Sequence, residues 1–121
     1  MNLGFEVALL RDTTATTTLV LRGELDLAAA GAAQEAVEMA LDDRARAYVL
    51  DLSDLHHLSA AGTTPLVRLT LGARQMGARV TARRAGTLVA LLLRLTPIEL
   101  DDAPLSLGRS LDRRPARAPA A

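Results

Sequence analysis

The 121-residue sequence contains no cysteine, no lysine and no tryptophan, and its only aromatic residues are one Phe and one Tyr. Without cysteine the chain can form no disulfide and perform no thiol chemistry, which fits a reducing cytoplasm. With so few aromatic rings, the core must be built from Leu, Val and Ala, which suits helices packed closely on a sheet. The most apolar segment, residues 88–95, is interrupted by Arg94 and is far shorter than the ~20 residues that span a bilayer. We therefore expect a soluble, cytoplasmic protein without membrane insertion.

A charge of one sign is also missing, because 14 arginines balance 14 acidic residues and the formal net charge is zero. A long-range field that attracts nucleic acid is therefore not expected from the whole chain, and we predict no direct nucleic-acid binding. The length fits one domain. We predict that this domain occupies residues 1–102. Residues 103–121 hold three prolines and four arginines with few bulky apolar side chains, so we predict a disordered tail there.

The first half of the chain predicts two strands, a helix and a third strand. Residues 3–10 and 16–22 are apolar and β-branched enough for strands, and the polar turn between them predicts a hairpin. Residues 28–42 carry apolar positions at helical spacing, with Asp26 as a plausible N-cap. Residues 47–52 form a continuous apolar run, which predicts a strand central in the sheet, followed by a polar loop.

The second half predicts alternating helices and strands. A second helix is expected to begin between residues 59 and 65 and to end near Met76, with Pro65 in its first turn and Gly77 after its end. Residues 78–82 predict a short strand, 85–95 a third helix and 98–100 a last short strand. The second helix should bury Leu66, Leu69 and Ala73, and the third should present one apolar face of Leu88, Leu91, Leu92 and Leu95. The predicted fold class is α/β, a mixed four- to five-stranded sheet packed with three or more helices.

Catalytic chemistry is poorly supported by the residues present. The only histidines, His56 and His57, are adjacent and lie close to Ser59. They allow a Ser–His pair, or they are polar residues of a strand-exit loop, and we take the second interpretation. Adjacent histidines lack the i, i+4 spacing of a metal site, and no Gly-rich phosphate loop follows a strand. We therefore predict no enzyme activity, no catalytic residue, no metal and no cofactor.

Ser59 precedes the second predicted helix and has two interpretations. The free N–H groups of a helix start carry the positive end of the helix dipole and favour an anion such as a phosphate. A serine at this position is also a common N-cap, whose hydroxyl accepts a hydrogen bond from the first turn. The sequence alone favours the N-cap.

Two stretches of the chain resemble the STAS domain family of anti-sigma factor antagonists. Leu21-Arg22-Gly23-Glu24-Leu25-Asp26 is similar to the family's Gly-Glu-Leu-Asp segment after the second strand. Val49-Leu50-Asp51-Leu52-Ser53 followed by Ser59-Ala60-Ala61-Gly62 is similar to its strand, loop and Asp-Ser-Ser-Gly helix start. The order and spacing of the two stretches also agree, over about residues 3–102.

The resemblance implies an anti-anti-sigma factor, a STAS-like fold and a function in transcription regulation. Such an antagonist binds an anti-sigma factor, often a kinase of the histidine-kinase-like ATPase class, and frees a sigma factor. Other STAS domains are non-enzymatic subunits of stress-signalling scaffolds or of lipid-transport (ABC transporter) complexes, and a homodimer is a further option. The residues expected to contact the partner are Asp26, Ser59, Ala60, Ala61, Gly62, Thr63, Thr64, Leu66 and Arg68.

The sequence departs from the family at the position that is normally phosphorylated. The second Ser of the family motif is the phosphoacceptor, and Ala61 stands in its place, with Ala60 for the preceding Ser and Ser59 for the Asp. Alanine has no hydroxyl, so position 61 cannot be phosphorylated. Either this control is lost, or Ser59, Thr63 or Thr64 serves as a displaced acceptor.

Overall fold

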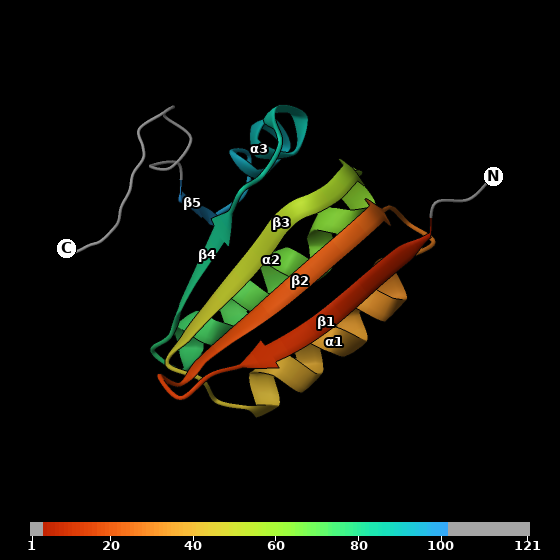
Figure 1. The fold of residues 1–121 in the computed structure, drawn as a ribbon. Helices are drawn as coiled ribbons and strands as arrows, with labels where there is room; N and C mark the ends of the chain where they lie inside the picture. The colour runs from red at the N-terminus through yellow and green to blue at the C-terminus, as the bar shows by residue number, and fades with distance from the viewer. Residues whose placement is uncertain (1–3, 102–121) are drawn as a thin grey trace.

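The structure, a computed structural model, describes residues 4–101, which form a mixed five-stranded sheet with three helices (Figure 1). The strand order follows the chain; the first two strands are antiparallel and all later neighbours are parallel. This confirms the predicted α/β class. The predicted tail, residues 103–121, lies outside the described residues. The elements are β1 (Phe5–Arg11), β2 (Thr16–Leu25), α1 (Ala30–Asp42), β3 (Ala47–Leu58), α2 (Ala60–Gln75), β4 (Arg79–Arg83), α3 (Thr87–Leu93) and β5 (Glu99–Asp101).

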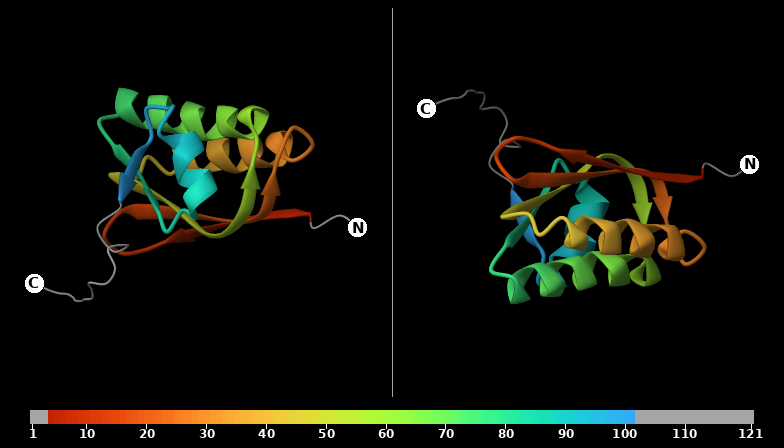
Figure 2. Two further views of the ribbon diagram at one scale, coloured as in Figure 1. Left: turned by 90° about the horizontal axis from the view of Figure 1, so that it is seen from above. Right: turned by 90° about the horizontal axis from the view of Figure 1, so that it is seen from below.

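The sheet is covered on one face only. Helices α1 and α2 lie side by side on that face, and no helix of residues 4–101 lies on the other (Figure 2). Side chains alternate between the two faces along a strand, so one face collects the apolar positions of every strand. One register row that faces the helices runs Leu9, Leu19, Leu50, Ala82, Leu100 across all five strands. The core is therefore built from leucine and alanine, as the scarcity of aromatic residues predicts.

Strands β2 and β3 are longer than predicted. β3 continues to Leu58, so His56 and His57 lie on a strand, and the expected strand-exit loop is absent. The pairing of β2 with β3 has two irregularities, after Val20 and after Gly23, where β3 contains additional residues. These bulges change the buried positions of β3 from every second to every third residue. The residues after Leu52 therefore lack the apolar run and the alternation that predict a strand.

Helix α2 begins within the predicted range, but the start of α1 and the place of Pro65 differ from prediction. Helix α1 begins at Ala30, and its N-cap position, Ala29, makes no side-chain capping bond. Asp26 is therefore not the N-cap, but its Oδ1 accepts a hydrogen bond from the Ala29 N–H at 3.1 Å and stabilises the turn before the helix. In α2, Pro65 lies in the second turn, because the helix already begins at Ala60. Gly77, with φ +79°, follows the helix end as predicted.

The apolar face of α3 was predicted wrongly. The buried side chains are Val89 and Leu93, whereas Leu88, Leu91 and Leu95 are exposed. Every residue of α3 after Thr87 is apolar, so no polar side in the sequence indicates which face is covered. The face was decided by the position of the helix against β3, which is a tertiary effect.

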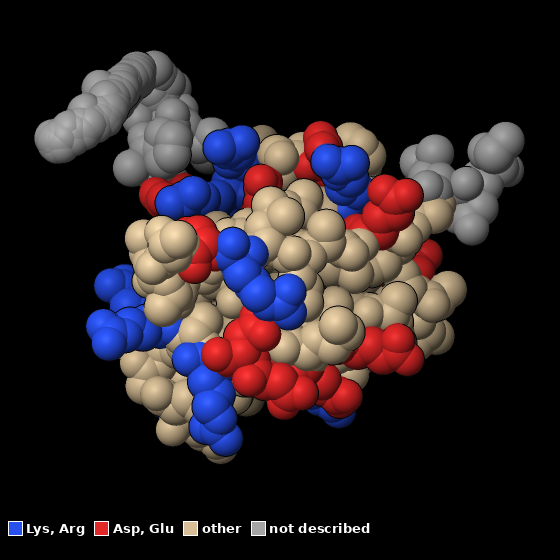
Figure 3. Space-filling view, turned by 60° about the horizontal axis from the view of Figure 1, so that its bottom comes forward, with Lys and Arg blue, Asp and Glu red and all other residues tan. Residues whose placement is uncertain are grey.

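Charged side chains of both signs lie on the surface of the molecule. Figure 3 shows acidic side chains grouped on one part of a face and basic ones beside them. Three ion pairs connect neighbouring strands across the uncovered sheet face: Arg22–Asp54, Arg79–Glu99 and Arg83–Asp101. Among residues 4–101, no helix has the length and apolar character to cross a bilayer, and no group of three metal-ligating side chains is found.

Candidate docking site at the start of α2

The two stretches that carry the family resemblance meet in space at the end of β2. The Ser59 N–H donates to the Leu25 carbonyl oxygen at 3.0 Å. Gly62 packs directly on the same carbonyl, since a Cβ at position 62 would lie 2.1 Å from the Leu25 oxygen. Only glycine permits this approach. The start of α2 is thus fixed against the carboxyl end of β2, with Asp26 as the next residue along the chain.

Ser59 is the N-cap of α2. Its Oγ accepts a hydrogen bond from the Gly62 N–H at 3.2 Å, and its carbonyl oxygen accepts one from the Thr63 N–H at 3.1 Å. The structure therefore confirms the N-cap interpretation. The N–H groups of Ala60 and Ala61 precede these bonded donors and have no partner within the helix. They place the positive end of the helix dipole at the surface.

The residues expected around the phosphoacceptor position differ in exposure. Ala60 and Thr64 are exposed, while Ala61, Ser59 and Thr63 are half-buried. The Thr63 hydroxyl donates to the Ala60 carbonyl oxygen at 2.6 Å, and the Ser59 hydroxyl is occupied as the cap. Thr64 is therefore the candidate acceptor with the most accessible hydroxyl.

Two residues predicted to contact a partner lie beneath the surface instead. Leu66 is fully buried in the core, as is expected for a residue that holds α2 on the sheet. Including Leu66 in the contact surface was therefore wrong, and Gly62 is also buried. The predicted burial of Leu66, Leu69 and Ala73 is confirmed. Arg68 is exposed, two turns along from Ala61, and it extends the accessible side of the helix.

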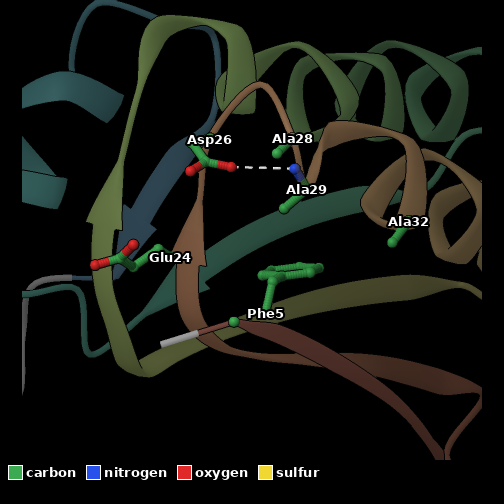
Figure 4. A pocket seen from close by; sticks show the side chains of 7 residues that line it. Phe5, Glu24, Asp26, Ala28, Ala29 and Ala32 are labelled. Carbon is green, nitrogen blue, oxygen red and sulfur yellow. Dashed lines mark hydrogen bonds between the residues drawn. The ribbon is translucent and has the colours of Figure 1, made fainter. Parts of the chain in front are cut away.

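A shallow pocket of 260 Å³ lies beside this site and was not predicted. Figure 4 shows Asp26 and Glu24 on one side of the pocket and the Phe5 ring with small alanine side chains on the other. The sequence could not indicate it, because its lining joins the first residues of β1 to the turn before α1. The described lining residues are Gly4, Phe5, Glu24, Asp26, Ala28, Ala29 and Ala32.

The structure shows which group Ser59 bonds to and where the two histidines lie. Ser59 Oγ bonds to the Gly62 N–H, and within residues 4–101 no hydrogen bond joins it to His56 or His57. Both histidines are exposed on β3. The carboxyl groups with lowered pKa lie on other parts of the fold: Asp12 and Asp43 around the β1–β2 turn, and Asp51 on β3. The Ser59 hydroxyl therefore acts as the cap of α2.

A mixed five-stranded sheet with two helices on one face, and a capped helix start fixed to the end of the second strand, defines a STAS-type domain. The family model described as "Mlab, STAS domain" matches residues 8–106, and the chain belongs to this family. A search of curated protein sequences gives no match.

Solved structures share the fold at low sequence identity. The anti-sigma factor antagonist SpoIIAA of Bacillus, in its unphosphorylated form, aligns with a TM-score of 0.65 and 15% identity, over 79% of this chain and 88% of that one. An anti-sigma factor antagonist from Mycobacterium paratuberculosis aligns at 0.62 and 22%, over 79% and 86%. The murine anion transporter Slc26a9 aligns at 0.60 and 13%, over 72% of this chain but 14% of the transporter. These likenesses concern the fold.

Proposed function

We propose that this chain is a non-enzymatic, cytoplasmic STAS protein that binds an anti-sigma factor of the histidine-kinase-like ATPase class and thereby releases a sigma factor. The observation that carries the proposal is the start of α2. Ser59 caps the helix, Gly62 fixes it to β2, and Ala60, Thr64 and Arg68 remain exposed around it. The similarity in fold to two anti-sigma factor antagonists supports the same function.

We further propose that binding is not controlled by phosphorylation at position 61. A phosphate adds about −1.5 to −2 charges to a contact surface, and in SpoIIAA both phosphorylated and unphosphorylated forms exist. Ala61 cannot carry this group. The complex should therefore form and persist in the presence of ATP, unless Thr64, Thr63 or Ser59 accepts the phosphate.

The test uses the full chain with kinase-type anti-sigma factors encoded beside its gene. Titration calorimetry with ATP present, followed by intact-mass measurement, should give a stoichiometric complex and no added phosphate. Ala61→Ser should restore phosphate uptake and reduce binding. Phosphate on the unmodified chain would contradict the loss of control, and peptide mapping would locate the acceptor.

A second experiment places a charge in the proposed contact surface. Ala60→Glu should weaken the complex more than tenfold, which equals about 1.4 kcal/mol, because a bulky charge enters the contact surface. Its fold should persist, since an acidic side chain is favourable in the first turn of a helix. Ala8→Glu, on the uncovered sheet face, is the matched control and should bind normally. Equal affinity of both variants would place the partner elsewhere.

A second candidate function is a STAS subunit of a lipid-transport complex or a stress-signalling scaffold. The description of the matching family model, "Mlab, STAS domain", and the occurrence of the fold within an anion transporter favour it. Transporter genes next to this one, and stable co-purification with a transporter ATPase, would support this candidate over the first.

A further inference from the structure

The sheet face that carries no helix within residues 4–101 is unusual for its parallel part. Strands β2 to β5 run parallel, and sheets of parallel strands are normally covered on both faces. In Figure 1 this bare face lies in front of the helices, with β1 at one edge and β5 at the other. Its middle is formed by uncharged and mostly small or β-branched side chains: Ala8, Leu10, Thr18, Val20, Ala47, Val49 and Thr81. An apolar cover over them would remove this surface from water.

A shallow groove of 410 Å³ lies on the bare face at its β5 edge. Its lining joins side chains of β3 and β4 to all three residues of β5: Ala47, Arg79, Thr81, Glu99, Leu100 and Asp101. The charges here are compensated, since Arg79 pairs with Glu99 at 3.0 Å and Arg83 with Asp101 at 3.8 Å. The groove therefore selects an apolar group rather than a charged one.

The chain itself supplies apolar groups next to this groove, because the sequence continues from Asp101. Leu105 and Leu107 follow Asp101 by four and six residues. Pro104 favours an extended backbone before it, and in an extended segment residues two apart lie on the same side. Neighbouring strands are about 4.8 Å apart, so Ala47 on β3 is about 10 Å from β5, a distance that about three extended residues span. Leu105 can therefore reach the groove.

Two further arguments favour this segment as the occupant. The matching family model extends to residue 106, beyond the end of β5, so the shared domain includes Leu105 and does not stop at the sheet. A second copy of the chain would lose translational and rotational freedom on binding, whereas a tethered segment has an effective concentration of about millimolar order. A small apolar groove therefore favours the tethered segment over a second copy.

We propose that residues 102–107 turn back from β5 across the bare face and place Leu105 in the groove, with Leu107 beyond it towards β2. The two leucines leave water, and the parallel strands gain a cover on their second face. The part of the chain expected to be disordered is then residues 108–121, which contain all four arginines of the tail.

A nitroxide label on Ser106→Cys tests the proposal, because the chain contains no other cysteine. Position 106 alternates with the two leucines, so the label points away from the sheet and leaves both in place. In the full chain the label should broaden the amide NMR signals of Ala47 and Thr81. The signals of Arg68 and Leu71, which are exposed on α2, should stay sharp.

Replacing both leucines in the labelled chain, Leu105→Ser with Leu107→Ser, should remove the broadening at Ala47. Leu111→Ser is the matched control, since it removes a leucine of the same tail outside the proposed segment, and it should leave the broadening unchanged. Equal broadening with and without Leu105 and Leu107 would overturn the proposal, because the tail would then pass the face without binding it. Absence of broadening at Ala47 in the labelled chain would overturn it as well.

A mixed sample separates the tethered segment from a second copy. It combines nitroxide-labelled chains that lack ¹⁵N with ¹⁵N-labelled chains that lack the nitroxide. Sharp Ala47 signals in this mixture are expected, and broadened ones would place a second copy on the bare face and overturn the proposal. No anti-sigma factor takes part in these measurements, so each result leaves the proposed function intact.

Discussion

Gly62 shows how one residue determines the position of the candidate site. Its missing side chain lets the first turn of α2 rest on the Leu25 carbonyl, which a Cβ would approach to 2.1 Å. Gly62→Ala should therefore destabilise the protein by about 2–4 kcal/mol, because backbone must move. Gly31→Ala is the matched control. It lies in α1 with nothing within 4 Å of its Cβ position and should stabilise the fold by about 0.5–1 kcal/mol. Urea denaturation of both variants tests this, and equal midpoints would contradict it.

Tyr48 is the residue that joins the end of α1 to the sheet. Its buried hydroxyl donates to the Ala40 carbonyl at 3.0 Å and accepts from the Ala45 N–H at 3.2 Å. Tyr48→Phe keeps the ring but leaves the Ala45 N–H without this acceptor, so the free energy of unfolding should fall by about 1–3 kcal/mol. Chemical denaturation measures the loss, and Thr63→Val, which removes a surface hydroxyl bond, should cost less. A neutral Tyr48→Phe would show that water replaces the hydroxyl.

At the scale of elements, the sequence predicted which helices and strands exist better than where they end. The apolar run of 47–52 predicted β3, but its last six residues were assigned to a loop. Burial there recurs every third residue because the strand contains bulges, and a bulge depends on the neighbouring strand β2. The 3.6-residue pattern of α2 was correct in its buried residues. Pro65 was placed one turn too early because the sequence left the start of the helix open between residues 59 and 65, whereas the helix begins at Ala60.

Helix α3 offers a direct test of an orientation that the sequence did not predict. Leu93 is fully buried and Leu91 is 57% exposed, although both belong to the same apolar run. Leu93→Ala should therefore cost about 2–5 kcal/mol of unfolding free energy, as expected for a cavity in a packed core. Leu91→Ala should change it by less than about 0.5 kcal/mol. Thermal and urea unfolding of the two variants give the comparison, and the opposite order would mean that α3 is rotated about its axis.

For the whole molecule, the candidate site was predictable in part. The motif around Ser59 and the segment ending at Asp26 were recognised as related, and the fold brings them together through the Leu25 carbonyl. The helical spacing of α2 also predicted the burial of Leu66, which shows that this residue cannot belong to the contact surface as well. The pocket beside Asp26 needed the three-dimensional packing, because β1 must lie next to the turn before α1. Sequence spacing does not contain that distance.

Stability of the whole domain should fall at acid pH through carboxylates that the fold stabilises. The Arg11 guanidinium, which donates to Asp43 at 2.7 Å, holds the pKa of that carboxyl below its usual value, helped by the Thr17 hydroxyl. Hydrogen bonds from Thr14 and Thr16 lower the pKa of Asp12. At Asp51, burial raises the pKa, but bonds from Ser53 and nearby arginines outweigh it, so this carboxyl is also more acidic than usual.

A carboxyl with a lowered pKa in the fold binds its proton more readily in the unfolded chain. Its contribution is complete above the unfolded value of about 3.9 and is lost as the pH falls through the lower folded value. The melting temperature should thus be level from neutral pH down to about pH 5 and then decline.

Asp43→Asn should lower the plateau and make the decline shallower, because one of the linked protons is gone. Asp42→Asn is the matched control, since Asp42 is exposed and has no ion pair within residues 4–101, and it should leave the profile unchanged. Calorimetric melting temperatures across this pH range decide the matter: parallel profiles for Asp43→Asn and the unmodified chain would mean that the Arg11–Asp43 pair does not persist in solution.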